Sequence, residues 1–250
     1  MPLLSIDPRE LAVLATSPQG APIVEATRAG YQRALLKFKD VGCCEVLGYQ
    51  VAMGLQVPVA SARGFCCHRA STCLGQPSGE YRIGVLIEEL KPFEVVADWK
   101  DAASKAPDAI VRALQLTLLG RYEWPELAMT ARGIVVFDLE RIFPPWSPER
   151  VDGQSWYDVG SEIHEQVQEY RETSGPWISE VISFAAQVGL LDRMKDHLAA
   201  SAQLTRNQLL SIFDLQPHPL ASLVTQLAAD AAARRFREAA ELALTPRGGR

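Results

Sequence analysis

The sequence predicts an α+β protein with a strand-rich first part and a mostly helical second part. Short runs rich in branched residues, separated by glycine and proline turns, occupy the first third of the 250-residue chain. Segments with apolar residues at helical spacing fill most of the remainder. A hydrophobic content of 48% with 22% charged residues is typical of a globular protein with a substantial buried core.

Two strands and a helix are expected early in the chain. Residues 23–26 and 34–38 are predicted to pair through a turn at Ala29 and Gly30. In the helix that follows, Leu47, Val51 and Leu55 are spaced four residues apart and form one apolar stripe.

Two further strands are expected before a change in pattern at residue 91. Residues 57–60 are too short for a helix, and Pro58 indicates a sheet edge or the end of a strand. Residues 81–90 form the strongest strand pattern of the chain, because they are rich in the branched residues that favour strands. The run ends in acids. Lys91 and Pro92 interrupt this pattern, so we predict a boundary between residues 1–91 and residues 92–250.

The second part is predicted to be mostly helical. Asp108 is expected to cap a helix that ends at Leu119, with Gly120 as its stop. Residues 121–132 are predicted to form a loop, and residues 133–138 a short buried strand that ends on an acid. Four more helices are predicted, at residues 157–171, 177–200, 205–213 and 219–244.

The composition favours a cytoplasmic protein without a nucleic-acid partner. The net charge of -5 and the isoelectric point near 5.5 give no basic surface for nucleic acid or an anionic membrane. No apolar run approaches the roughly 20 residues of a membrane-spanning helix. The first residues contain proline and an acid where a signal peptide needs a basic start and a longer apolar stretch.

The cysteines favour reduced thiols. The five are Cys43, Cys44, Cys66, Cys67 and Cys73. An odd number with two adjacent pairs and no export signal argues against a disulfide framework. With His68 they could supply the thiolate and imidazole ligands of zinc, but no C-x-x-C spacing occurs. Buried free thiols are therefore the preferred interpretation, and a metal or redox sensor is the weaker one.

Three ionisable residues stand in an order that indicates phosphate binding. Lys37 lies in an apolar, strand-like run, and burying an ammonium is costly unless a carboxylate or phosphate meets it. Glu45 begins the following helix, and Asp138 ends the later strand. In the kinase fold, a strand lysine steadies the nucleotide phosphates, a helix glutamate holds that lysine, and a later aspartate binds magnesium.

Four stretches extend this pattern to a family. They are residues 31–38; Cys44-Glu-Val-Leu-Gly-Tyr-Gln-Val-Ala-Met-Gly-Leu-Gln-Val-Pro; Gly84-Val-Leu-Ile-Glu; and Gly133-Ile-Val-Val-Phe-Asp-Leu-Glu-Arg-Ile-Phe. In these stretches the chain resembles the HipA-like kinases, relatives of the bacterial phosphoinositide 3-/4-kinase-like proteins. The resemblance implies a two-lobed protein-kinase-like fold, with an N-lobe at residues 1–91 and a C-lobe at residues 92–250. It also implies that Lys37 and Glu45 bind ATP and that Asp138 binds magnesium.

The catalytic loop of that family is degenerate in this chain. Family members have an asparagine, an aspartate-arginine pair and a second asparagine shortly before the metal-binding strand. Residues 119–129 contain neither aspartate nor asparagine, and Glu123 is the nearest stand-in for the catalytic base. The longer side chain displaces the carboxylate, and a shift of about 1 Å can cost on the order of a hundredfold in rate. The sequence therefore favours a pseudokinase that acts as a protein-binding or regulatory module.

Alternatives remain open for the function and for each residue. An active enzyme would transfer phosphate from ATP to a protein Ser or Thr hydroxyl, with Glu123 and Asp138 as its catalytic residues. Lys37 could instead extend into water from an edge strand. Glu45 could simply favour the first turn of its helix, Asp138 could cap a turn, and Glu123 could be a solvated loop acid.

Overall fold

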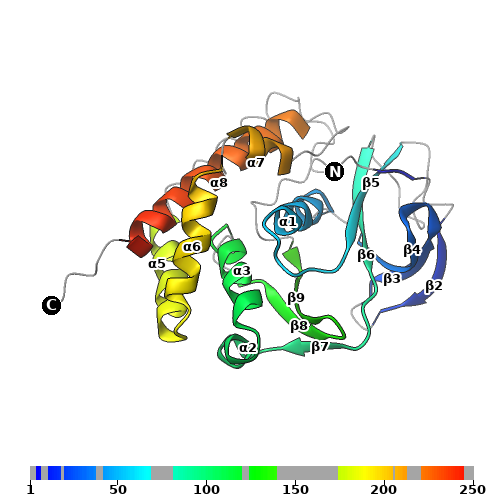
Figure 1. Ribbon diagram of the computed structural model, residues 1–250. Coiled ribbons are helices and arrows are strands. Elements are labelled where there is room, and N and C mark those ends of the chain that lie inside the picture. The colour runs from blue at the N-terminus through cyan, green and yellow to red at the C-terminus, as the bar shows by residue number, and fades with distance from the viewer. Residues whose placement is uncertain are drawn as a thin grey trace.

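The chain folds into a mixed α+β structure in which sheets dominate the N-terminal region and helices the later part (Figure 1). This confirms the predicted α+β class. The computed structural model describes residues 4–6, 11–17, 20–37, 42–68, 81–119, 124–139, 174–204, 206–212 and 221–244. The helix predicted at residues 157–171 lies outside the described residues, as does Glu123.

A six-stranded sheet forms most of the first part. Its strands are β1 (Leu4–Ser5), β2 (Ala12–Thr16), β3 (Pro22–Ala26), β4 (Tyr31–Lys37), β5 (Ala62–His68) and β6 (Tyr81–Glu88). Their order is β1-β5-β6-β4-β3-β2, and all neighbours are antiparallel except β1 and β5. The predicted pairing of β3 with β4 is confirmed. Their connection, the short 3-10 helix η2 (Thr27–Ala29), ends at Gly30, whose φ of 86° glycine adopts without a steric penalty.

Alternate residues of β4 face two different cores. Ala34 and Leu36 are buried in a smaller cluster made by the strands and the segments beside them, whereas Leu35 packs against the larger cluster. The larger cluster contains the buried face of helix α1 (Gly42–Gly54), and it includes Leu47 and Val51 of the predicted stripe together with Leu55, which directly follows the helix. Because side chains alternate along a strand, Lys37 shares the face of Leu35 and lies on the α1 side of the sheet.

A second, three-stranded sheet and two helices follow. These elements are β7 (Phe93–Val96), α2 (Trp99–Lys105), α3 (Pro107–Thr117), β8 (Glu126–Thr130) and β9 (Gly133–Phe137). The strand predicted at residues 133–138 is confirmed as β9. The predicted loop at residues 121–132 is wrong, because β8 pairs on both sides, with β7 and β9. The cap predicted at Asp108 is also wrong, since Ala106 caps α3 and Pro107 opens it.

Residues 57–60 do not form the predicted strand, and only one isolated bridge occurs in them. Their backbone makes an isolated parallel bridge between Val59 and Val136, and the Val136 N–H donates to the Pro58 carbonyl at 2.8 Å. Pro58 has no N–H for a ladder of its own, so the segment stops at one bridge. This bridge ties β9 to the chain directly after α1.

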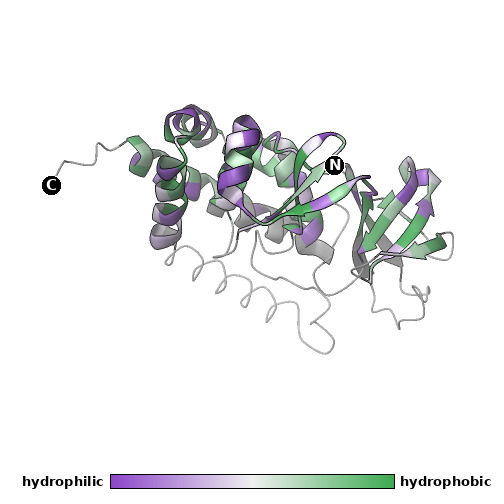
Figure 2. Ribbon diagram, turned by 90° about the horizontal axis from the view of Figure 1, so that it is seen from below, coloured by the Kyte–Doolittle hydropathy of each residue, from purple (hydrophilic) through white to green (hydrophobic). Residues whose placement is uncertain are grey.

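The later helices pack around α8. They are α5 (Ser174–Gln187), α6 (Leu191–Ala202), α7 (Arg206–Ile212) and α8 (Ala221–Leu244), and α8 contacts the other three. The single helix predicted at residues 177–200 is two helices, because Gly189 takes a φ of 72° between α5 and α6. Figure 2 shows that several of these helices carry both hydrophilic and hydrophobic residues. Within the described residues, no helix is long and apolar enough to cross a bilayer.

The burial of α3 predicts a large difference between two leucine substitutions. Leu114 is fully buried, whereas Leu242 on α8 is 45% exposed. We expect Leu114→Ala to lower the free energy of unfolding by about 3 to 5 kcal/mol, because it removes buried methyl groups and leaves a cavity. Leu242→Ala should change it by about 0.5 kcal/mol or less. Urea denaturation of both variants measures the difference, and equal effects would contradict this packing.

Candidate functional site

Lys37, Glu45 and Asp138 meet in the structure. The Lys37 Nζ lies 3.1 Å from Oε2 of Glu45 and 2.8 Å from Oδ1 of Asp138. The three residues come from the end of β4, the first turn of α1 and the position directly after β9. The Lys37 ammonium therefore connects β4 of the first sheet with helix α1 and with the end of β9 in the second sheet.

Glu45 is the buried centre of this group. Its side chain has no exposed surface, and its two oxygens have different donors. Oε2 accepts from the Lys37 ammonium, and Oε1 accepts from the Leu139 backbone N–H at 3.3 Å. Burying a carboxylate is costly without such donors, so this arrangement makes Glu45 more than a favourable acid in the first helical turn.

Asp138 and Lys37 form the solvent-facing side of the group. Their side chains are 37% and 29% exposed. Asp138 has a φ of 56°, in the left-handed region that aspartate enters more readily than most residues. The bond between Val136 and Pro58 fixes the strand just before this turn. Such a conformation costs about 1 to 3 kcal/mol, and residues of this kind cluster at functional sites.

The electrostatics keep Lys37 charged. Burial alone would lower the pKa of Lys37, but the nearby carboxylates of Glu45 and Asp138 outweigh it and raise the pKa above its ordinary value. Tyr49, one turn after Glu45, is completely buried. Burial raises the Tyr49 pKa well above the usual value, and the negative charges of Glu45 and Asp138 raise it further.

This geometry suits a phosphate with a divalent cation. The Lys37 ammonium is a point charge that a phosphate oxygen can approach from the solvent side. Asp138 presents a carboxylate, the ligand type that magnesium takes from proteins in ones or twos while phosphates and waters complete its shell. No group of three His, Cys, Asp or Glu able to hold a metal by itself occurs among the described residues.

The remaining sequence-predicted side chains lie outside the part of the chain that the structure describes. The structure does not describe Glu123 or Cys73, nor the side chains of the other four cysteines. Sequence reasoning missed two residues beside the site, Tyr49 and Gly48. A glycine inside a helix is a signal of close packing, since it disfavours the helix by about 1 kcal/mol relative to alanine.

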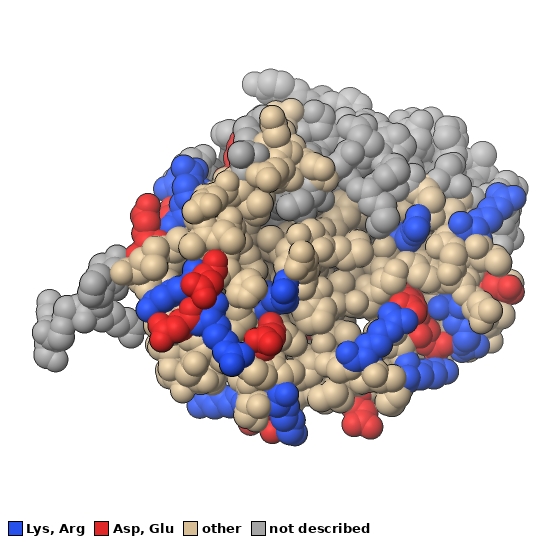
Figure 3. All heavy atoms as spheres, in the orientation of Figure 1, with Lys and Arg blue, Asp and Glu red and all other residues tan. Residues whose placement is uncertain are grey.

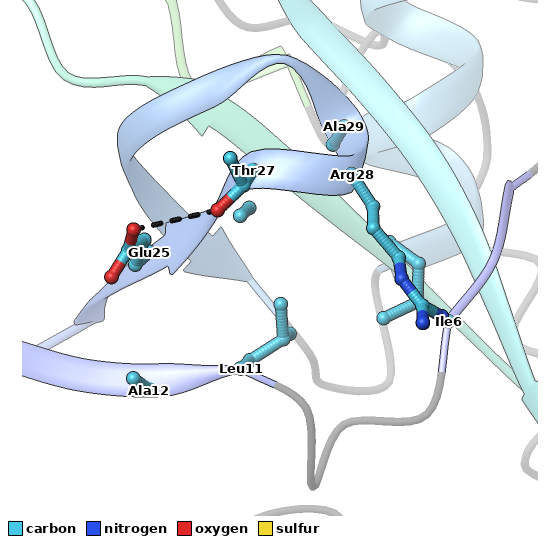
Figure 4. A pocket seen from close by; sticks show the side chains of 8 residues that line it. Ile6, Leu11, Ala12, Glu25, Thr27, Arg28 and Ala29 are labelled. Carbon is cyan, nitrogen blue, oxygen red and sulfur yellow. Dashed lines mark hydrogen bonds between the residues drawn. The ribbon is translucent and has the colours of Figure 1, made fainter.

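A separate hollow lies beside β2, β3 and η2 of the first sheet. It has a volume of about 410 Å³ and is lined by Ile6, Leu11, Ala12, Glu25, Ala26, Thr27, Arg28 and Ala29. In Figure 4, Glu25 and Arg28 lie on opposite sides of it. None of the three residues of the ion-pair group lines this hollow.

Among the described residues, the face seen in Figure 3 shows no patch of a single charge sign. Lysine and arginine side chains of the described residues are interspersed there with aspartate and glutamate. This mixed pattern gives no added support for a nucleic-acid surface on that face.

Comparison with known proteins adds no relative. The sequence matches no family model, and no curated protein or solved structure matches it. The function is therefore inferred from the chemistry of the site and from the sequence resemblance.

Removing the Lys37 charge should destabilise the fold. In Lys37→Met the buried Glu45 carboxylate loses its cation. Such a loss lowers the free energy of unfolding by about 3 to 5 kcal/mol in fully buried pairs. Here we expect about 2 to 3 kcal/mol, because Lys37 is partly exposed. Lys105→Met is the matched control, because Lys105 pairs with Asp101 at the surface and should contribute about 0.5 kcal/mol or less. Urea denaturation distinguishes the two, and a silent Lys37→Met would contradict the buried pairing.

The raised pKa of Tyr49 predicts a loss of stability at high pH. The unfolded chain releases this proton near the ordinary pKa of 10.0, whereas the folded chain retains it. The contribution of Tyr49 to the free energy of unfolding should therefore be constant well below pH 10 and fall above it, by up to about 1.4 kcal/mol per pH unit. Lys37 acts in the same direction above 10.5. Tyr49→Phe should show a shallower decline in urea titrations between pH 9 and 11, and an unchanged slope would refute the prediction.

Proposed function

We propose that the chain is a divergent HipA-like kinase-fold protein that binds a magnesium-nucleotide and acts as a pseudokinase, a regulatory module for a protein partner. Residues 1–91 and 92–250 would be its two lobes. The observation that carries the proposal is the contact of one lysine ammonium with Glu45 and Asp138, which are 8 and 101 positions away in the sequence.

The placement of the three residues supports nucleotide binding. In protein kinases the phosphate-binding lysine lies on the third strand and pairs with a glutamate of a helix, and a later aspartate holds magnesium. Here Lys37 ends the third strand of the antiparallel run β2-β3-β4, and Glu45 belongs to the next helix. Asp138 directly follows β9 and faces solvent beside the lysine.

The charge of the site supports a requirement for magnesium. Two carboxylates surround one ammonium, which leaves a net negative group where the phosphates would enter. A triphosphate is itself strongly negative, so it would be repelled unless a divalent cation accompanied it. Asp138 would hold that cation, and Lys37 would contact the phosphates.

The stretch between α3 and β8 supports binding without transfer. It contains eight residues, 118–125, and its single acid is Glu123. The Trp177 indole N–H donates to the Thr117 carbonyl, and the buried Arg235 donates to the Leu118 carbonyl. At its other end, Trp124 packs edge-on against Trp99 and other aromatic rings. These contacts anchor both ends of a short connection that lacks the family's catalytic aspartate.

Exposed apolar strands support a protein partner. All five residues of β2 are exposed, and β2 is the outer strand of its sheet, with Val13 and Leu14 on its surface. Phe93 and Val95 are exposed on β7, the outer strand of the second sheet. Edge strands of this kind can accept an added strand from another chain.

An active kinase is the second candidate, and the exposure of Lys37 and Asp138 favours it. Both side chains face solvent, so a nucleotide bound there would present its terminal phosphate to an incoming hydroxyl. The base in that reaction would be Glu123.

Thermal unfolding with nucleotide tests the proposed function. Magnesium-ATP at about 100 times its Kd should stabilise the protein by roughly 2.7 kcal/mol, which raises the Tm by several degrees. ATP with a chelator should give a much smaller shift. Lys37→Met should lose the magnesium-ATP shift, while Lys105→Met should keep it. Absence of any shift at millimolar magnesium-ATP would reject a nucleotide site.

Labelled ATP separates the two candidates once binding is established. The pseudokinase is expected to bind nucleotide without transferring its terminal phosphate to itself or to added protein. Transfer that is lost in Asp138→Asn would establish the active kinase instead.

A further inference from the structure

Helix α1 approaches the segment after Asp138 so closely at Gly48 that no side chain fits between them. A Cβ built on Gly48 would lie 2.4 Å from the Leu139 carbonyl oxygen and 2.7 Å from the Leu139 Cβ. Real Cβ atoms essentially never come within 3.0 Å of such atoms. The closest atom belongs to the backbone, so a side-chain rotation could not relieve the clash.

The same segment is held by Glu45, which lies three residues before Gly48. Residues three apart share a helix face, so Glu45 and Gly48 present one surface to Leu139. Glu45 accepts the Leu139 N–H, and Gly48 makes room for the Leu139 carbonyl. Leu139 is itself fully buried in the larger core. The Leu139 backbone is therefore held against α1 by its N–H bond to Glu45, while its carbonyl packs closely against Gly48.

Backbone conformation does not explain this glycine. Gly20, Gly30, Gly133 and Gly189 have positive φ values, whereas Gly48 lies within a helix where any L-residue fits the backbone. Glycine disfavours a helix interior, so its presence there needs another cause. The contact with Leu139 supplies that cause.

We propose that Gly48 is a positioning residue that holds Asp138 at Lys37. This inference rests on the proposed function, because it concerns the residue expected to bind the cation. Any Cβ at position 48 pushes Leu139 away from α1, and Asp138 moves with it because the two residues are adjacent. The Leu139 N–H then leaves Glu45, and the Asp138 carboxylate leaves its place beside the ammonium.

The test compares Gly48→Ala with Gly175→Ala. Gly175 also lies in a helix, and a Cβ there would meet nothing within 4 Å. The dissociation constant of ATP is measured with magnesium and with a chelator. Gly48→Ala should weaken the magnesium-dependent binding by about tenfold or more, since a displacement near 1 Å is enough to spoil a site. Binding in the chelator should change little, because Lys37 and Glu45 remain. Gly175→Ala should match the wild type in both conditions.

Hydrogen exchange gives a readout that needs no nucleotide. The Leu139 amide should exchange about tenfold faster or more in Gly48→Ala than in the wild type, while the amides of β5 and β6 keep their protection. If the wild type fails to bind magnesium-ATP, the proposed function falls, and this measurement still decides the role of Gly48. The inference would be overturned if Gly48→Ala kept both the wild-type exchange rate of the Leu139 amide and the wild-type affinity for magnesium-ATP.

A second measurement covers the case in which Gly48→Ala does not fold. In the wild-type protein, the Leu139 amide should be protected to within about tenfold of the amides of Val51 and Ala52 in α1, since the segment opens together with the helix. A Leu139 amide that exchanges freely while α1 stays protected would show that the segment is not fixed to the helix, and would overturn the inference.

Discussion

The burial of the Glu45 carboxylate is the constraint on which the site depends. A fully buried carboxylate needs strong donors, and Glu45 has the Lys37 ammonium on one oxygen and the Leu139 N–H on the other. Lys37 ends β4 of the first sheet and Leu139 lies two residues after β9 of the second sheet, so the two donors come from parts of the chain far apart in sequence. Satisfying one charge therefore fixes β4, α1 and the end of β9 relative to one another.

Contacts outside the ion-pair group support this arrangement. Gly48 lets the backbone at Leu139 lie against α1, and the Pro58 carbonyl accepts the Val136 N–H just before the turn. Arg132, in the turn between β8 and β9, forms a two-pronged ion pair with Glu88 at the end of β6. Surface pairs of this kind contribute little stability alone, but this one joins the same two sheets. The ion-pair group is thus supported on several sides.

The sequence predicted local features better than tertiary ones. The α1 stripe, the pairing of β3 with β4 and the strand before Asp138 follow from patterns of neighbouring residues. Strand β8 was missed because its five residues owe their conformation to partners on both sides. Likewise, the break at Gly189 depends on a φ that the surrounding helical pattern does not reveal.

The same division applies to the site. Lys37 and Glu45 are eight positions apart, and the cost of burying a lysine was enough to suggest a partner on the next helix. Asp138 is 101 positions from Lys37, and only the order of these residues in the kinase fold and the family resemblance connected them in advance. Gly48 and Tyr49 could not be assigned, because their roles arise from close approach and burial. Burial and separation in space are properties of the folded chain.

The two acids around Lys37 differ in a way that bears on the proposed function. Glu45 is fully buried and holds the Leu139 backbone, so it cannot leave the ammonium without breaking the core. Asp138 is partly exposed, and a phosphate could take its place on the ammonium while a cation takes up its carboxylate. Leu139 follows Asp138 and lies against α1. Replacement of Asp138 by a phosphate on the ammonium would therefore also affect the contact between Leu139 and α1. A binding module that signals to a partner needs such a connection, and it needs no catalytic base.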